Sequence, residues 1–429
     1  MLFAVVKQLR RRHRRPPLGA PSLRRLGLPA FVAVLGPGLL AGLSDDDPAG
    51  ITTYSIAGAR YGYTLLWVLL LAVGALVVYH ELGARLGLAT GQGLVGLVRT
   101  SYGRPATFVV TATLVVANVG TTCAEFAGVA AGLGLAGISR YLSVPAAAVV
   151  VGLVVLRGSF HRVEHLLLLL STAFVTYVVA AYLAHPDWAD AAQGMVVPKL
   201  PLNREAVVVV TAMVGTTLAP WGVAFIQSYA ADKRLTQADL RYERVDVFSG
   251  AILTGVIGAF VIVACAATLY STGHREINDA RDAAVALEPL AGHSAATLFA
   301  FGLVGAALLA AAVVPLSTAY SVAEAFGQES ALDDSFAEAP LFYGSYLGVL
   351  GVGAVVVMVP GLPLVPILFL TQVLNAVLLL PLLVAMRSLA RRRELMGALA
   401  NGRIGDALAL AALAIVAISI VALATAALA

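Results

Sequence analysis

The sequence is poor in charged and aromatic residues. Only 12% of its 429 residues are charged and 7% are aromatic, and the mean hydropathy is +0.89. A domain with a water-facing surface needs more charge than this, so the composition predicts an integral membrane protein. Few aromatics combined with 41 glycines disfavour an outer-membrane β-barrel with aromatic girdles and indicate an all-α bundle of closely packed helices.

Cysteine is nearly absent as well. Cys123 and Cys265 both lie in apolar stretches, which excludes a disulfide framework or a thiolate metal cluster and favours two small packing residues. The sequence also lacks HExxH, GxSxG and P-loop motifs. We therefore expect no enzyme and no cofactor.

Long apolar stretches account for most of the chain. A bilayer core about 30 Å thick needs roughly 20 apolar residues per helix, and on this count about eleven transmembrane helices are predicted. They lie near residues 30–58, 63–85, 106–134, 143–157, 163–184, 205–230, 246–271, 295–325, 341–359, 363–386 and 405–427.

The basic residues predict the orientation of these spans. Residues 1–29 contain a run of arginines and are expected to form a cytoplasmic tail. If that tail is inside, most of the 28 Lys and Arg residues fall in inner segments, as the positive-inside rule requires. We therefore expect a multi-pass protein of the cell membrane whose basic residues orient it in the lipid bilayer and bind no nucleic acid.

The first span carries an interruption that a continuous helix does not tolerate. Ser44 is followed by three acids, Asp45, Asp46 and Asp47, and then by Pro48 and, two residues later, a glycine. Proline removes a backbone donor, glycine weakens a helix, and buried Asp is costly in a membrane. An unwound segment is therefore expected here.

The sixth span repeats this interruption. Pro220-x-Gly222 stands at the point that matches Pro48-x-Gly50, five spans later. An odd number of spans per unit makes the second unit inverted relative to the first, which predicts a LeuT-like transporter that binds its cargo between two unwound helices. The predicted units are residues 30–184 and 205–386, with 405–427 as an additional helix.

Several motifs follow one another in the order of a known family. They are Gly36-Pro37-Gly38, Asp47-Pro48, Arg60-Tyr61-Gly62-Tyr63, Ala84-Arg85-Leu86-Gly87, Ala124-Glu125, Gly215-Thr216-Thr217 with Pro220, and Gln372-Val373-Leu374. In this order they resemble the Nramp family of divalent-metal transporters. The resemblance covers spans one to ten and implies a metal site between the two broken helices.

Two departures from the family pattern bear on the metal. The family's asparagine in the first broken helix is Gly50 here, and its methionine in the sixth is Ala219. The altered pair looks like the Nramp-related magnesium transporters. Without a soft sulfur ligand the preference for transition metals weakens, and a wider, all-oxygen site suits partly hydrated Mg²⁺, with Mn²⁺ as a further substrate.

The resemblance also implies the site residues. Asp47 is the expected main ligand, the carbonyls of Ser44 and Thr216 are expected backbone ligands, and Gly50 and Ala219 line the space. Four further residues are secondary candidates for the site. Gln372 and Asn375 bind the ion or join helices. Asp45 and Asp46 hold water around the ion or line its entry path, or else they cap the unwound segment or pair with a basic residue.

Proton coupling in the family involves acids in span three and a histidine after the span-six proline. Glu125 is retained here, whereas Thr122 and Trp221 stand at the other two positions. The relay is thus largely missing, and we expect cation import driven by membrane potential with little or no proton coupling. Glu125 remains a functional candidate, with a structural role as its alternative.

Three other functions stay open. One is a proton-coupled Mn²⁺ or Fe²⁺ transporter of the Nramp type. Another is a Na⁺-coupled symporter of a small organic solute, which the three acids at the first break disfavour. The last is a membrane receptor or scaffold that no longer transports. The expected partners are the lipid bilayer and a divalent metal ion; the oligomeric state stays open, a monomer being plausible.

Overall fold

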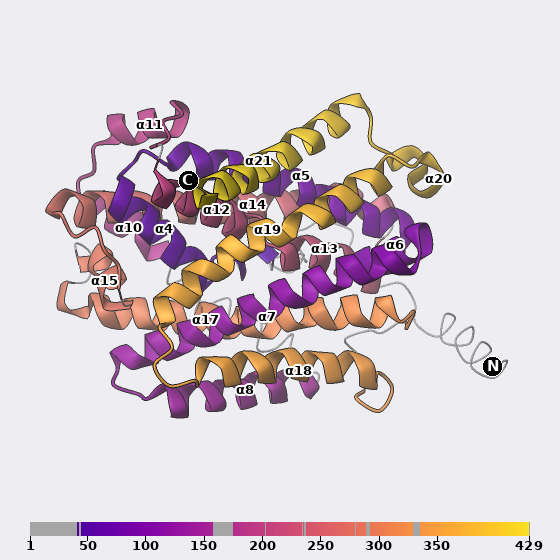
Figure 1. Ribbon diagram of the computed structural model, residues 1–429, viewed down its shortest axis with the longest axis horizontal. Helices are drawn as coiled ribbons and strands as arrows, with labels where there is room; N and C mark the ends of the chain where they lie inside the picture. Colours follow the sequence, from indigo (N-terminus) through magenta and orange to yellow (C-terminus); the bar gives the residue numbers. More distant parts are fainter. Residues whose placement is uncertain are drawn as a thin grey trace, which may run out of the picture.

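A computed structural model describes residues 41–42, 44–157, 175–201, 203–233, 235, 237–278, 280–288, 292–328 and 335–428. Every regular element in these ranges is a helix (Figure 1), which confirms the predicted all-α class. The predicted cytoplasmic tail, residues 1–29, lies outside the described residues, as do most of the first half of span one and much of span five.

Eight helices in the described ranges are long and apolar enough to cross a membrane. They coincide with eight of the predicted spans. They are α5 (Leu66–Thr90), α7 (Arg104–Leu135), α12 (Arg204–Thr217) continued by α13 (Pro220–Asp232), α14 (Leu240–Cys265) with a π-helical turn (Ala266–Tyr270), α17 (Ala295–Ala325), α18 (Pro340–Val357), α19 (Leu364–Ala390) and α21 (Arg403–Leu428).

Shorter helices occupy the other three predicted spans. They are α4 (Pro48–Tyr61) in span one, α8 (Arg140–Leu156) in span four and α10 (Thr176–Leu183) in span five. Further short helices lie in the connections: α6 (Leu94–Tyr102), α11 (Trp188–Val196), α15 (Ala280–Ala284) and α20 (Arg393–Met396).

Spans one and six are both interrupted, as the Pro-x-Gly repeats predict. Residues 44–45 are helical, the chain bends at 46–47, and α4 begins at Pro48. In span six, α12 ends at Thr217 and α13 begins at Pro220. Each proline is the first residue of a half-helix, where its missing N–H leaves no hydrogen bond unmade.

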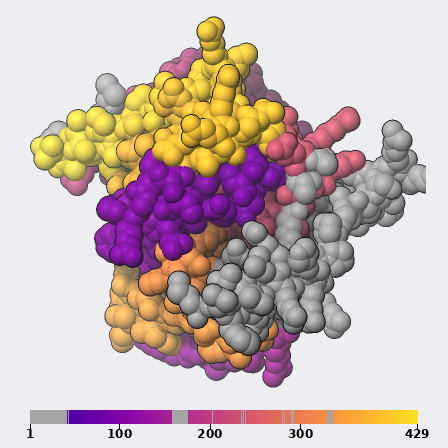
Figure 2. Space-filling model, turned by 90° about the vertical axis from the view of Figure 1, so that its right-hand side faces the viewer, coloured from indigo at the N-terminus to yellow at the C-terminus, as the bar shows by residue number. Residues whose placement is uncertain are grey.

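The helices pack around a central pair, α7 and α17, which lie side by side (Figure 1). On one side α18 covers this pair, and on the other α19 packs on α7 while α13 packs on α17. The C-terminal helix α21 lies outside, against α12, α5 and α19, and Figure 2 shows the yellow C-terminal residues at one edge of the molecule. The two broken helices are therefore enclosed by longer ones.

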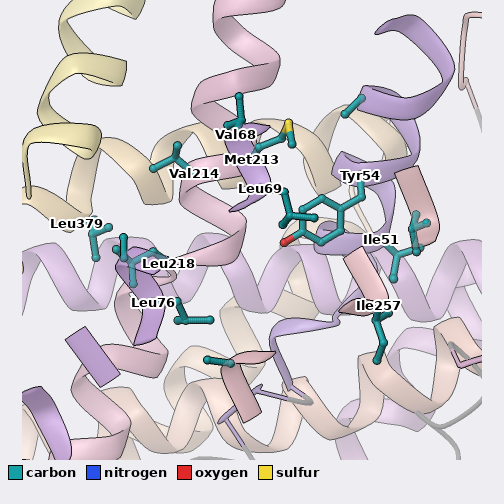
Figure 3. Packing of buried hydrophobic residues seen from close by; sticks show 14 of the residues in the cluster. Ile51, Tyr54, Val68, Leu69, Leu76, Met213, Val214, Leu218, Ile257 and Leu379 are labelled. Carbon is teal, nitrogen blue, oxygen red and sulfur yellow. The ribbon is translucent and has the colours of Figure 1, made fainter. Parts of the chain in front are cut away.

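Glycines let α4 lie directly on α14. A Cβ added at Gly258 would be 2.9 Å from the Tyr54 ring, and one at Gly58 would be 2.9 Å from the Cβ of Cys265. The ring of Tyr54 lies among apolar core side chains (Figure 3), and its hydroxyl is 2.9 Å from Oγ1 of Thr217. This bond, which contributes about 1 kcal/mol, joins the two broken helices.

Candidate metal-binding site

The bend in span one makes Asp47 the N-cap of α4. Its backbone is extended (φ −76°, ψ 170°), and its Oδ1 accepts a hydrogen bond of 2.5 Å from the N–H of Gly50. Asp before Pro at the first helical position is a strong local signal for a helix start. This hydrogen bond fixes the carboxyl group of Asp47 where the helix of span one is interrupted. Its other oxygen, Oδ2, takes no part in the bond.

Oxygen atoms from both broken helices converge beside Gly50. The point where a Cβ would lie on Gly50 is 2.8 Å from the carbonyl oxygen of Asp45. It is 3.3 Å from Oδ1 of Asp47 and 3.3 Å from Oγ1 of Thr216. Because glycine leaves this point empty, a carbonyl, a carboxylate and a hydroxyl oxygen face the same small volume.

The Ser44 and Thr216 carbonyls stay predicted ligands, and one backbone oxygen lies close to the Cβ point of Gly50. It belongs to Asp45, the residue after Ser44, and span six turns the hydroxyl of Thr216 to the same point. Ser44 is buried, and the hydroxyls of Ser44 and Thr216 have no hydrogen-bond partner within the described residues. Sequence reasoning missed the Thr216 hydroxyl, although a threonine just before an expected break is a signal for it.

Glu125 on α7 lies beside Asp47. The two side chains are close enough for a carboxyl–carboxyl hydrogen bond. Ionised carboxylates only accept hydrogen bonds, so this contact needs a shared proton or a cation. Gly128 makes the contact possible, because Pro48 approaches α7 so closely that a Cβ at Gly128 would overlap its ring.

Four acidic side chains are thus buried around the first break. Asp45, Asp46, Asp47 and Glu125 are at most 4% exposed. Among the residues that the structure describes, none of them forms an ion pair with a basic side chain. Burying several acids without a counter-charge is costly, so the arrangement requires protons or a cation.

The amides of span ten lie in a network with span three. Asn375 Nδ2 donates to Thr121 Oγ1 (3.0 Å) and to Gln372 Oε1 (3.1 Å). The backbone of Gln372 also touches α12 at Gly215, where a Cβ would overlap its carbonyl oxygen. The side chain of Asn375 therefore joins α19 to α7, in agreement with the helix-joining alternative, while the side-chain hydrogen bonds that Gln372 makes among the described residues stay within α19.

The two altered proton-route positions make packing contacts. Thr122 Oγ1 donates to the carbonyl of Asn118 (2.7 Å), and its methyl carbon would be 2.7 Å from a Cβ at Gly353. Trp221 is buried, and its carbonyl accepts a hydrogen bond of 2.9 Å from Ser317 Oγ. Ala219, also buried, is the residue before α13 and supplies no side-chain cap.

Comparisons with known proteins agree with this architecture. The Nramp family, described as natural resistance-associated macrophage protein-like, matches residues 38–426. The divalent metal cation transporter MntH of Granulibacter bethesdensis is 28% identical over 388 residues, which are 88% of this chain and 84% of the relative.

Two solved structures share the fold. One is the manganese transporter of Eremococcus coleocola in complex with an aromatic bis-isothiourea compound, with a TM-score of 0.78 at 18% identity over 95% of this chain and 90% of that one. The other is Mhp1, a nucleobase-cation-symport-1 family transporter, with a TM-score of 0.56 at 14% identity over 92% of this chain and 93% of that one. These likenesses confirm the predicted LeuT-like class. The chain belongs to the Nramp family, a family of membrane transporters and not of enzymes.

Proposed function

We propose that the chain is a divalent metal cation transporter that imports partly hydrated Mg²⁺ by alternating access, with little or no proton coupling. The observation that supports this most is the group of buried acids at the first break, which has no basic partner within the described residues. A dication between Asp47 and Glu125 would offset their repulsion and use oxygens that are otherwise unpaired. The ion is substrate rather than a resident cofactor.

The donor atoms beside Gly50 favour a hard ion. Asp47 and Thr216 offer side-chain oxygens and Asp45 a carbonyl, and Ala219 stands where the family has a thioether. Mg²⁺ takes oxygen ligands and keeps several waters, so a few protein oxygens suffice for it. Mn²⁺ accepts the same oxygens and is expected as a further substrate.

The membrane potential is sufficient as a driving force. An inside-negative potential contributes about 2.3 kcal/mol per charge per 100 mV, hence about 4.6 kcal/mol for a dication. Thr122 and Trp221 are engaged in packing and carry no titrating group near neutral pH. Import into a cell through its membrane, with the N terminus inside, then needs no second ion.

A proton-coupled Mn²⁺ transporter is the second candidate. The contact between the carboxyl groups of Asp47 and Glu125 favours it, because such a pair can hold a proton. The relatives named for manganese or for divalent metal cations are consistent with both candidates.

The test is metal influx into proteoliposomes that contain the full chain. Mg²⁺ and Mn²⁺ uptake are compared under an imposed inside-negative potential while internal pH is recorded. Asp47→Ala removes the proposed main ligand. Asp190→Ala is the matched control, because Asp190 lies exposed on α11.

We expect Mg²⁺ uptake without acidification, lost in Asp47→Ala and retained in Asp190→Ala. Mn²⁺ uptake alone, with acidification that follows it, would instead support the proton-coupled candidate. Uptake that persists in Asp47→Ala would contradict both.

A further inference from the structure

His80 is a buried histidine that the site beside Gly50 does not use. It lies in α5 and is 0% exposed. Within the described part of the chain, neither of its ring nitrogens has a hydrogen-bond partner. A buried imidazole that makes no hydrogen bond is costly, so this side chain needs a partner such as a bound ion or a water molecule.

Two glycines determine what His80 faces. A Cβ at Gly83 would be 3.3 Å from the carbonyl oxygen of Val223, and one at Gly87 would be 2.7 Å from that of Gln227. Positions 80, 83 and 87 follow the three- and four-residue spacing of one helix face. The close packing of α5 on α13 therefore turns His80 toward the beginning of α13.

The imidazole of His80 and the carboxyl group of Asp45 face one small space beside Gly222. The point where a Cβ would lie on Gly222 is 3.4 Å from His80 Nε2 and 3.7 Å from Asp45 Oδ1. Asp45 is 2% exposed, and neither of its carboxyl oxygens has a hydrogen-bond partner among the described residues. The nitrogen of His80 and the carboxylate oxygen of Asp45 are thus available to one bound ion, and Gly222 has no side chain that would occupy its space.

We propose that Asp45 and His80 form a second cation position, which receives the ion from Asp47 and prefers transition-metal dications to Mg²⁺. The proposal rests on the proposed function, since the ion bound here is the transported metal ion itself. Asp45 lies two residues before Asp47 on the side away from α4. With the N terminus inside, this is the cytoplasmic side of the first site.

The donor set decides which ions stay at this position. Imidazole nitrogen suits transition metals such as Zn²⁺, whereas Mg²⁺ takes oxygen ligands and keeps its water. One nitrogen and one carboxylate leave the remaining coordination positions to water. Zn²⁺, Co²⁺ and Mn²⁺ are therefore held longer than Mg²⁺, and at low concentration they slow Mg²⁺ uptake.

Pulsed electron paramagnetic resonance of Mn²⁺ bound to the full-length protein tests this directly, because a coordinated imidazole adds nitrogen modulation to the echo. We expect the modulation in the unmodified protein, its loss in His80→Gln, and its retention in His274→Gln, which alters an exposed histidine. Equal modulation in the unmodified protein and His80→Gln, or none in either, would overturn the proposal.

Gly222→Ala provides a second test that leaves both donors in the chain. The added methyl group would make ordinary contacts, at 3.4 Å and 3.7 Å, so the helix tolerates it, yet it occupies the space of the ion. We expect nitrogen modulation to disappear. In the same variant, the Zn²⁺ concentration that halves Mg²⁺ uptake should rise at least tenfold. Unchanged modulation and unchanged inhibition would refute the position.

Asp47→Ala separates this proposal from the proposed function. If Asp47→Ala still transports Mg²⁺ while His80→Gln and Gly222→Ala lose the modulation, the proposed function is wrong and the second position stands. If Asp47→Ala abolishes uptake while His80→Gln keeps full modulation, the proposed function is supported and the second cation position is refuted.

Discussion

Gly50 has no side chain at the point where oxygens of Asp45, Asp47 and Thr216 converge. Gly50→Ala keeps the backbone N–H that caps Asp47 but fills the proposed ion space with a methyl group 2.8 Å from the Asp45 carbonyl. We expect Mg²⁺ uptake in proteoliposomes to fall at least tenfold. Gly74→Ala is the control, because a Cβ there meets no atom within 4 Å; equal uptake by the two variants would show that the ion binds elsewhere.

Ala219 is the residue at which the effect of a sulfur ligand on metal selectivity can be tested. Ala219→Met restores a soft sulfur donor at the break in span six, which favours Mn²⁺ over Mg²⁺. The ratio of Mn²⁺ to Mg²⁺ uptake should rise about tenfold, equivalent to about 1.4 kcal/mol. Ala219→Leu adds similar bulk without sulfur and should leave the ratio unchanged. An equal shift in both variants would assign the effect to volume.

At the scale of helices, Glu324 of α17 joins three elements. Its Oε2 accepts from the N–H groups of Val95 (3.0 Å) and Gly96 (3.1 Å) at the start of α6, and its Oε1 accepts from Ser228 Oγ of α13 (2.8 Å). Gly93 leaves room for this carboxyl group, since a Cβ there would overlap it. Half-helix α13 is thereby attached to α6 and α17 at the predicted inner side, so its movement must break these bonds.

Glu324→Gln should loosen this attachment. A neutral amide oxygen accepts more weakly from the two N–H groups of α6 than a carboxylate oxygen does, while its NH₂ group can donate to Ser228 Oγ. Hydrogen bonds to charged groups contribute about 1.5–3 kcal/mol, and we expect amide hydrogen exchange at Val95 and Gly96 to accelerate at least tenfold. Glu394→Gln, at an exposed position of α20, is the control. Unchanged exchange in Glu324→Gln would mean that α6 is held by other contacts.

The elements could be predicted from the sequence where local chemistry determines them. Pro48 and Pro220 begin half-helices because the first turn of a helix accommodates proline without losing a hydrogen bond, and a glycine two residues later weakens a continuous helix further. The contact of Asp47 with Glu125 was not predictable, since it depends on how closely α4 approaches α7. The position of His80 against α13 was missed for the same reason: the rotation of one helix against another is set by packing, which no spacing encodes.

At the scale of the whole molecule, the direction of transport depends on which end faces the cytoplasm. Figure 1 shows α11 and α20 at opposite ends. The connection around α11 carries few basic residues, whereas the one around α20 contains Arg391, Arg392 and Arg393. The positive-inside rule predicts that α20 faces the cytoplasm and α11 the outside. In this predicted orientation, the Glu324 attachment and the proposed Asp45–His80 position would lie inward of Asp47.

Cysteine labelling in intact cells measures this orientation. Cys123 and Cys265 are both buried, so the labelling of a single introduced cysteine can be measured without replacing them. Ala192→Cys is on exposed α11, and Gly402→Cys is exposed beside α21, where a Cβ meets no atom within 4 Å. A membrane-impermeant maleimide should label Ala192→Cys in intact cells and Gly402→Cys only after the membrane is opened. The opposite pattern would reverse the proposed orientation, and an inside-negative potential would then drive cations into the cell from the side of α20.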